Sequence, residues 1–361
     1  MKKIVTFNFI RNRVLGLSFI ILISVAFAVT MVNVSCGPDD PEVDLVGNWI
    51  ELSDFEGVPR SDAVGFAIGI KGYVGTGYNP DADNDTAEIW LDGRARDFWE
   101  YDPDRNTWNQ VADFPGKNRN GAVGIGTDTK GYVGTGYDGK NSLNDFWEYD
   151  PVLNAWTQKA PFEGTKRYGA VGFSIGNKCY IGTGYDGYYL KDFWEYDPAG
   201  DAWTKKASVG GSKRTNAAGF AINGKGYVCT GVDNGAYEDD FWEYDPATDV
   251  WIEKKSISNV TDEAFDDGYT TLKGINKVAF TMGGKGYLAT GGEGTATAIV
   301  WEYDPATDLW EEKTAFEGTA RVDAVSFVIG SRAYVTTGRS SSYYFDDIWA
   351  FEPGSEFNDN D

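Results

Sequence analysis

Trp99-Glu100-Tyr101-Asp102-Pro103 is the first copy of a five-residue phrase that recurs along this 361-residue chain. The phrase returns with its tryptophan at Trp147, Trp194, Trp242 and Trp301, and a degenerate sixth copy runs from Trp349 to Pro353. The steps between successive tryptophans are 48, 47, 48, 59 and 48 residues. A fixed period near this length is typical of radial repeat folds, in which every repeat builds one supersecondary unit. The repeat therefore argues for one closed unit, although the length alone would suggest two domains.

Each repeat contains four segments with the pattern of short strands. In the third repeat, residues 170–175 alternate small and large side chains, and residues 179–184 follow a glycine turn and end in Gly-Thr-Gly. The third segment is Asp192–Tyr196, and after an Asp-Pro turn a fourth begins at Trp203. Side chains alternate between the two faces of a strand, so the first segment has one small and one bulky face. We therefore expect a four-stranded antiparallel sheet from each repeat.

These features together resemble the Kelch repeat. The resemblance rests on the glycine pair after the second strand, on the phrase Asp-Phe-Trp-x-Tyr-Asp-Pro, and on a second tryptophan nine residues after the first. It covers residues 46–353. It implies an all-β fold, a six-bladed Kelch-type β-propeller with four antiparallel strands in each blade.

The second tryptophan indicates how the ring closes. It is present in five repeats, as Trp108, Trp156, Trp203, Trp251 and Trp310, but Asn358 stands at its place in the sixth. Trp49, in a strand-like segment with no blade before it, precedes Tyr73 by 24 residues, the spacing that also separates Trp108 from Tyr132. We therefore expect the N-terminal strand to complete the last blade, which removes the free edges of the ring.

The N-terminus has the features of a targeting segment. Four basic residues (Lys2, Lys3, Arg11 and Arg13) precede or flank the start of an apolar run over residues 14–32, and no acidic residue appears before Asp39. This pattern predicts a secretory signal peptide over residues 1–35. The apolar run of 19 residues is also long enough for an uncleaved membrane anchor, which stays open as an alternative.

The end of this segment resembles a bacterial lipobox. It reads Asn33-Val34-Ser35-Cys36, with Asn33 at a place where leucine is usual, and the resemblance implies lipidation of Cys36. The acidic stretch that follows resembles the surface-export signal of Bacteroidetes lipoproteins. We expect an exported protein, anchored by its lipid to the bacterial outer membrane on the periplasmic side or the cell surface. Residues 36–45 are then an acidic linker, residues 46–353 the propeller and residues 354–361 a disordered tail.

Composition excludes several classes of function. The net charge of −23 argues against a nucleic-acid partner and against electrostatic docking on anionic lipid, although plain solubility also explains it. The chain has no histidine, which excludes Ser-His-Asp and Cys-His nucleophile systems and every histidine-ligated metal. A copper enzyme of the galactose-oxidase type, which needs histidine ligands, is therefore excluded. Cys179 and Cys229 lie roughly 10 Å apart along equivalent strands, too far for a disulfide, and we expect two buried free thiols.

Loop lengths single out one face of the propeller. With the strands of a blade named a to d in chain order, the b–c and d–a loops open on one face, which we call the variable face. The two long insertions of the chain fall there, between Tyr78 and Asp97 and between Trp251 and Tyr287. Binding residues commonly lie in variable loops on a rigid scaffold, although drift in unimportant loops is the alternative.

An arginine series points to the same face. Its members each stand thirteen residues before the strand-b tyrosine, and Gly274 takes this place in the fifth repeat; they are Arg60, Arg119, Arg167, Arg214 and Arg321. Guanidinium groups near the tunnel mouth would suit a carboxylate-bearing ligand. Alternatively, each arginine pairs with a repeated aspartate such as Asp145 or Asp192, in a structural role.

Two further sets of candidates lie in the same loops. Tyr78, Trp90, Tyr137 and Tyr185 could stack on sugar rings or anchor a peptide, unless they pack within turns. Asp81, Asp83 and Asp85 alternate like the opening of a calcium loop, although Thr86 stands at the sixth place, where such loops have glycine. Calcium is thus the one possible cofactor, with a plain acidic loop as the alternative.

Three functions remain open. The first is a monomeric, non-enzymatic propeller that binds a glycan, a peptide or a partner protein through the variable face. The second is a sugar mutarotase or epimerase, because bacterial sialic-acid mutarotases are six-bladed Kelch-like proteins and the arginine series suits a carboxylated sugar. No acid–base constellation in the sequence singles out a catalytic residue, which favours the binding role. A purely structural envelope protein is a third possibility.

Overall fold

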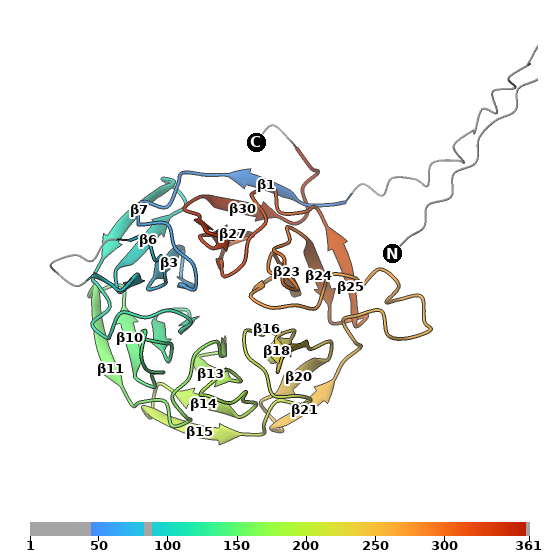
Figure 1. Cartoon of the computed structure of the whole chain (residues 1–361), viewed down its shortest axis with the longest axis horizontal. Coiled ribbons are helices and arrows are strands. Elements are labelled where there is room, and N and C mark those ends of the chain that lie inside the picture. The colour runs from blue at the N-terminus through green and yellow to red at the C-terminus, as the bar shows by residue number, and fades with distance from the viewer. Residues whose placement is uncertain (1–44, 83–88, 359–361) are drawn as a thin grey trace, which may run out of the picture. The chain divides into compact units, whose positions relative to one another are not determined.

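The chain folds as a six-bladed β-propeller. The computed structural model describes residues 45–82 and 89–358, and within them six four-stranded antiparallel sheets surround a central axis (Figure 1). The expected fold class is therefore confirmed. No helix occurs in the described ranges, and so none there is long and apolar enough to span a membrane.

Each blade contributes its strands from the axis outward. Strand a lines the axis: β2 (Val64–Ile68), β8 (Val123–Gly126), β12 (Val171–Ile175), β16 (Ala218–Ile222), β22 (Val278–Met282) and β26 (Val325–Ile329). Strand b follows: β3 (Lys71–Gly75), β9 (Gly131–Gly134), β13 (Lys178–Gly182), β17 (Lys225–Cys229), β23 (Lys285–Ala289) and β27 (Arg332–Thr336). Strand c holds the repeated phrase: β6 (Phe98–Asp102), β10 (Phe146–Asp150), β14 (Phe193–Asp197), β20 (Phe241–Asp245), β24 (Val300–Asp304) and β30 (Ile348–Glu352). Strand d is outermost: β7 (Thr107–Val111), β11 (Ala155–Lys159), β15 (Ala202–Lys206), β21 (Val250–Glu253), β25 (Leu309–Lys313) and β1 (Asn48–Glu51).

Three b–c loops add small hairpins on the variable face. They pair β4 (Trp90–Leu91) with β5 (Arg94–Ala95), β18 (Val232–Asp233) with β19 (Ala236–Tyr237), and β28 (Arg339–Ser340) with β29 (Tyr343–Tyr344). These hairpins belong to blades 1, 4 and 6, numbering the blades by the order of their strands a. They stiffen loops that would otherwise be irregular.

The N-terminal strand closes the ring as predicted. Blade 6 has the strand order β1-β30-β27-β26, and Figure 1 shows β1 alongside β30. Trp49 is fully buried between the rings of Phe316 and Phe351, with ring-centroid distances of 4.8 and 4.6 Å. The end of the chain also contributes: Ser355 O accepts a hydrogen bond from Gly47 N at 2.9 Å, and Asn358 N donates to Asn48 Oδ1 at 2.8 Å. Part of the segment expected to be a disordered tail thus contacts the closing strand.

At the interfaces around the axis, a large side chain in strand a of one blade packs against a small residue in strand b of the next. Phe66 of blade 1 covers Gly131 of blade 2 so closely that a Cβ there would lie 2.3 Å from its ring. At the next interface the smaller Ile125 faces Cys179 instead, within one buried cluster. The glycine in strand b therefore admits the neighbouring phenylalanine. At the interface of Ile125 with Cys179 both partners differ, whereas Ala333 of blade 6 shares a cluster with a retained phenylalanine, Phe280. Cys179 and Cys229 are both buried free thiols, as expected.

The repeated phrase is a set of hydrogen-bonding positions within the blade. In blade 2 every polar group of the phrase has a partner: Trp147 Nε1 donates to Asp145, Glu148 accepts from Tyr132, Tyr149 donates to Asn154, and Asp150 pairs with Lys130. The side chain of Asn154 also accepts a bond from the backbone of Ala112 in blade 1. The phrase therefore joins strands within a blade and blades to one another.

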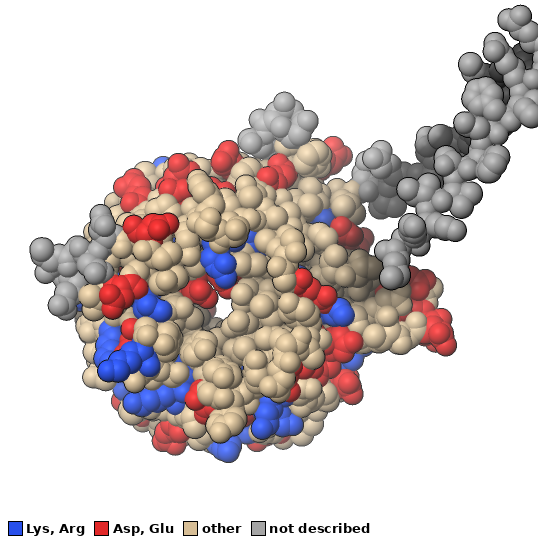
Figure 2. Space-filling view, viewed as in Figure 1, with Lys and Arg blue, Asp and Glu red and all other residues tan. Residues whose placement is uncertain are grey.

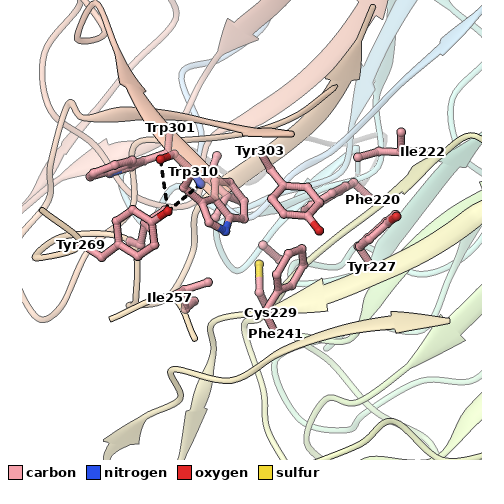
Figure 3. Close-up of a cluster of buried hydrophobic side chains, with 13 residues drawn as sticks. Phe220, Ile222, Tyr227, Cys229, Phe241, Ile257, Tyr269, Trp301, Tyr303 and Trp310 are labelled. Atoms are coloured by element: carbon pink, nitrogen blue, oxygen red, sulfur yellow. Dashed lines mark hydrogen bonds between the residues drawn. The ribbon is translucent and has the colours of Figure 1, made fainter. Parts of the chain in front are cut away.

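The second long insertion belongs to the core rather than to a free loop. It follows β21 and buries Ile257, Tyr269 and Leu272 between blades 4 and 5. The Tyr269 hydroxyl accepts a hydrogen bond from Trp310 N at 2.7 Å and donates to Trp310 O at 3.2 Å (Figure 3). This insertion therefore seals an interface between blades, and its length is no evidence for a ligand.

Candidate functional site

A tunnel of small residues runs along the axis. Two overlapping cavities, of about 260 and 220 Å³, are lined by strand a of every blade, and Figure 2 shows the opening at the centre of the ring. The lining is glycine, alanine, serine and apolar side chains, with Lys277 the charged residue among those lining the described cavities. Such walls offer few specific contacts, so recognition has to occur at the mouth of the tunnel.

Six equivalent residues form a rim around the mouth on the variable face. All have positive φ, between 52° and 61°; they are Asp62, Gly121, Gly169, Asn216, Asn276 and Asp323. Backbone N–H groups link neighbours around this rim: Asp62 N donates to Asp323 O and Gly121 N to Asp62 O, both at 3.0 Å. The rim therefore fixes the d–a loops of all the blades against one another. Its side chains are two carboxyls, two amides and two glycines.

The two carboxyl groups of the rim lie next to each other and share a hydrogen bond. Burial and the neighbouring charge of Asp62 raise the pKa of Asp323 well above its ordinary value, even though Arg339 Nη2 lies 3.1 Å from its Oδ2. Burial also raises the pKa of Asp62, against the lowering effects of Arg339 and Arg94. Two carboxyls so close together cannot both ionise freely, and their burial favours a proton shared between them.

A row of five tyrosine side chains and one arginine, which we call the tyrosine arc, leads away from this pair across blades 1 to 3. Its members are Tyr78, Arg94, Tyr137, Tyr168, Tyr185 and Tyr189. The Arg94 guanidinium lies 4.9 Å from the ring of Tyr78 and 5.3 Å from that of Tyr137. Successive tyrosine rings then follow at 5.2 to 5.7 Å, and all are part-exposed. Three residues predicted from the sequence are thus brought together.

The arginine series has a different place. All five side chains (Arg60, Arg119, Arg167, Arg214 and Arg321) are fully buried, and each is paired with the repeated aspartate of its blade. In blade 2, Arg119 donates two bonds of 2.7 Å to Asp145, one of 2.8 Å to Thr135 O and one of 2.9 Å to Lys117 O. Phe114 covers the face of the guanidinium at 4.7 Å. Their donors bind groups within the blade, and in four of the five an aromatic ring covers the guanidinium, so the geometry favours the structural role over ligand contact.

Trp90 also lies in a buried place. Its side chain is only 5% exposed, and its ring lies 4.8 Å from the Arg60 guanidinium, opposite Phe55. The first insertion therefore covers a buried arginine with the tryptophan expected to bind a ligand. Arg94, from the same hairpin, is the residue that reaches the tyrosine arc, and no repeat pattern in the sequence pointed to it.

In blade 5, a lysine that donates to backbone carbonyls takes the place of the arginine–aspartate pair. Gly274 and Ile299 stand where the other blades have the arginine and the aspartate. Lys277 enters from a position that is alanine in the other blades, and its Nζ donates to Thr290 O at 3.2 Å and Thr271 O at 3.1 Å. Thr290 O is the counterpart of the carbonyl that each arginine binds. Lys277 thus donates to the carbonyl that the arginine binds in the other blades, and both of these Nζ hydrogen bonds go to carbonyls rather than to a carboxylate.

This arrangement predicts an unusual pH dependence. Burial lowers the pKa of Lys277 to about 8, so between that pH and 10.5 the folded chain binds fewer protons than the unfolded chain. Stability therefore rises with pH through this window. We expect Lys277→Met to lack that gain, so that wild type improves relative to the variant by about 1–3 kcal/mol between about pH 7.5 and about pH 10. Urea unfolding at both pH values measures this, and a pH-independent difference would contradict it.

The remaining predicted sites lie wholly or partly outside the described residues. Asp83 and Asp85 of the calcium hypothesis and the lipidation site Cys36 are all outside them. Asp81 is described, and its backbone N–H binds Asn79 Oδ1 at 2.9 Å. No cluster of three metal-ligating side chains occurs among residues 45–82 and 89–358.

Comparisons with known proteins agree with the fold. The model of the Kelch motif matches residues 136–163, which include the phrase of blade 2. The solved structure of YjhT matches with a TM-score of 0.66 at 16% identity, over 82% of this chain and 95% of that one. No curated protein sequence matches the chain at a significant level. Because 851 chains of solved structures match, the likeness identifies a widespread fold that carries a Kelch motif here, and function has to be argued from the site.

Proposed function

We propose that this chain is a carbohydrate-binding propeller that holds a glycan across the tyrosine arc and the mouth of the tunnel. The observation that carries the proposal is the arc itself, a row of part-exposed rings on the variable face. Tyrosine offers a flat apolar ring for stacking on a sugar and a hydroxyl for hydrogen bonding. Arg94, held between two of these rings, adds a fixed group of donors.

A glycan suits this surface better than a protein partner does. The hot spots of protein interfaces are also rich in tyrosine and arginine, but they lie in well-packed, fully desolvated pockets. The rings of the arc instead lie in a part-exposed row, which suits stacking on a sugar. Among the described residues, the strongly exposed side chains of Val152 and Leu153 lie in the c–d turn of blade 2, on the opposite face.

The location of the protein is part of the same proposal. A lipid on Cys36 would attach the chain to the outer membrane through the acidic linker, where polysaccharides are accessible. Labelling of cells with a radioactive fatty acid, compared between wild type and Cys36→Ala, tests the anchor. Equal incorporation into both would remove it.

Glycan-array binding tests the proposed function. We expect Tyr137→Ala and Tyr185→Ala each to weaken the strongest array signal by about fivefold or more, because each removes one stacking ring. Both side chains are part-exposed, so the melting temperature should stay close to that of wild type. Leu153→Ala, on the opposite face, is the matched control. Absence of any glycan signal, or equal loss in all three variants, would refute the proposal.

A sugar mutarotase is the second candidate, and the Asp62–Asp323 pair favours it. Opening a sugar ring needs a proton donor at the ring oxygen and an acceptor at the anomeric hydroxyl. A carboxyl pair that holds one proton offers both. Polarimetry of freshly dissolved reducing sugars, N-acetylneuraminic acid included, separates the candidates: faster mutarotation than with Asp62→Asn supports the enzyme, and binding without acceleration supports the first proposal.

A further inference from the structure

We propose that the Asp62–Asp323 pair is the hydroxyl-binding subsite of the glycan site. Two neighbouring hydroxyl groups of one sugar ring donate hydrogen bonds to the two carboxylates, and the proton that the pair holds in the free protein passes to solvent. This inference rests on the proposed function and makes glycan binding a proton-releasing reaction. It thereby names the kind of group that the mouth recognises.

The geometry holds both carboxyl groups in place before a ligand arrives. Asp62 N donates to Asp323 O at 3.0 Å, which fixes the separation of the two backbones. Both residues have positive φ, 52° and 58°, a conformation that aspartate tolerates better than most residues. Asp323 is 8% exposed and Asp62 is part-exposed, so the pair is recessed but not sealed from solvent.

Burial raises the pKa of both carboxyl groups and favours retention of a proton, and two neighbouring arginines act in the opposite direction. Arg339, from the hairpin of blade 6, contacts Asp323, and Arg94, from the hairpin of blade 1, acts on Asp62. Tyr344 is close enough to Arg339 and Asp62 for their charges to act on it, and Tyr78 lies against Arg94. Hydrogen bonding from a ligand would favour the ionised carboxylates, which is the condition for proton release.

Arg94 links this pair to the tyrosine arc. It belongs to the arc through its contacts with Tyr78 and Tyr137, and its charge also acts on Asp62. Gly121 occupies the rim position of blade 2, where a Cβ would lie 3.6 Å from Tyr168 Cβ of the arc. The arc therefore comes close to the rim on the side of blades 2 and 3.

Stability of the free protein provides the first test. A carboxyl whose pKa is raised in the folded state destabilises that state as pH rises above its ordinary value of 3.8. We therefore expect Asp323→Asn to melt at least about 2 °C higher than wild type at about pH 7.5, with a smaller difference at about pH 5. Asp233→Asn, on the hairpin of blade 4, should change neither value. A pair kept only for structure predicts the reverse, a variant that melts below wild type at both pH values.

Proton release on binding provides the second test. The glycan with the strongest array signal is titrated calorimetrically in phosphate and in Tris, whose ionisation heats differ. We expect wild type to release up to about one proton per glycan bound. Its affinity should therefore increase as pH rises towards the pKa of the pair. Asp62→Asn and Asp323→Asn should release none and bind at least about tenfold more weakly, since each loses an ionised acceptor.

The outcomes separate this inference from the function on which it rests. Glycan binding that depends on Tyr137 and Tyr185 but releases no proton, and is unchanged by Asp323→Asn, overturns the subsite and leaves the proposed function standing. Absence of glycan binding overturns both. Proton uptake in place of release would also overturn the subsite, because it would mean that the pair binds a ligand in its fully protonated form.

Discussion

Arg119→Ala is expected to destabilise the propeller by about 3 kcal/mol while the tyrosine arc stays intact. The side chain of Arg119 is fully buried, and its removal leaves Asp145 with a charge in a largely buried place. Four backbone or carboxylate acceptors also lose their donor. Breaking such a pair costs more than the pair contributes in net terms, because the remaining charge is uncompensated.

The same substitution has a predictable dependence on pH. Burial alone would raise the pKa of Asp145, but the hydrogen bond and charge of Arg119 outweigh it and lower the pKa below its usual value. Wild type therefore keeps this contribution until pH falls below the ordinary aspartate range, towards the lowered pKa of Asp145. In the variant, burial acts alone and raises that pKa, so the variant regains stability by protonating Asp145 at pH values above the ordinary range. The difference between them should narrow between about pH 7 and about pH 4.

Matched variants separate this mechanism from a general effect of losing an arginine. Arg105, 79% exposed and paired with Asp102 at the surface, should cost at most about 0.5 kcal/mol when replaced by alanine. Replacing both Arg119 and Asp145 by apolar residues of similar size should recover most of the loss. If Arg119→Ala keeps wild-type stability but loses glycan binding, the arginine contacts the ligand and the structural assignment is wrong.

The blade count and the closing strand were predictable because they follow from spacing. A fixed interval between tryptophans needs no knowledge of side-chain environment, and the missing second tryptophan of the last repeat pointed to Trp49. The role of the arginines was less accessible, since a guanidinium suits a ligand carboxylate and an internal aspartate equally well. The deciding signal lay in the fifth repeat, where Gly274 and Ile299 replace the arginine and the aspartate together. A ligand site would not require both to be lost at once.

The carboxyl pair could not be predicted from the repeat pattern. Asp62 and Asp323 lie near opposite ends of the propeller sequence and become neighbours only because the ring closes between blades 1 and 6. Each also occupies a position that is glycine or asparagine in the other repeats, so neither belongs to the conserved internal pattern. The residues proposed to bind a ligand are therefore those in which one repeat differs from another.

Deleting residues 45–53 is expected to have the largest effect on stability, because it removes β1 and opens the ring. Four residue pairs between β1 and β30 would be lost, together with the burial of Trp49 against Phe316 and Phe351. Trp49→Ala alone should cost about 4 kcal/mol, since it leaves a large cavity and frees the Thr314 carbonyl.

The deletion adds an unpaired edge on β30, which is a template for association between chains. We expect early, less cooperative unfolding and dimers or larger species by light scattering, whereas Val46→Ala, at a half-exposed side chain beside the strand, should behave like wild type. A deletion variant that stays monomeric and unfolds cooperatively at the wild-type temperature would show that blade 6 needs only three strands, and the argument that the N-terminal strand closes the propeller would lose its energetic basis.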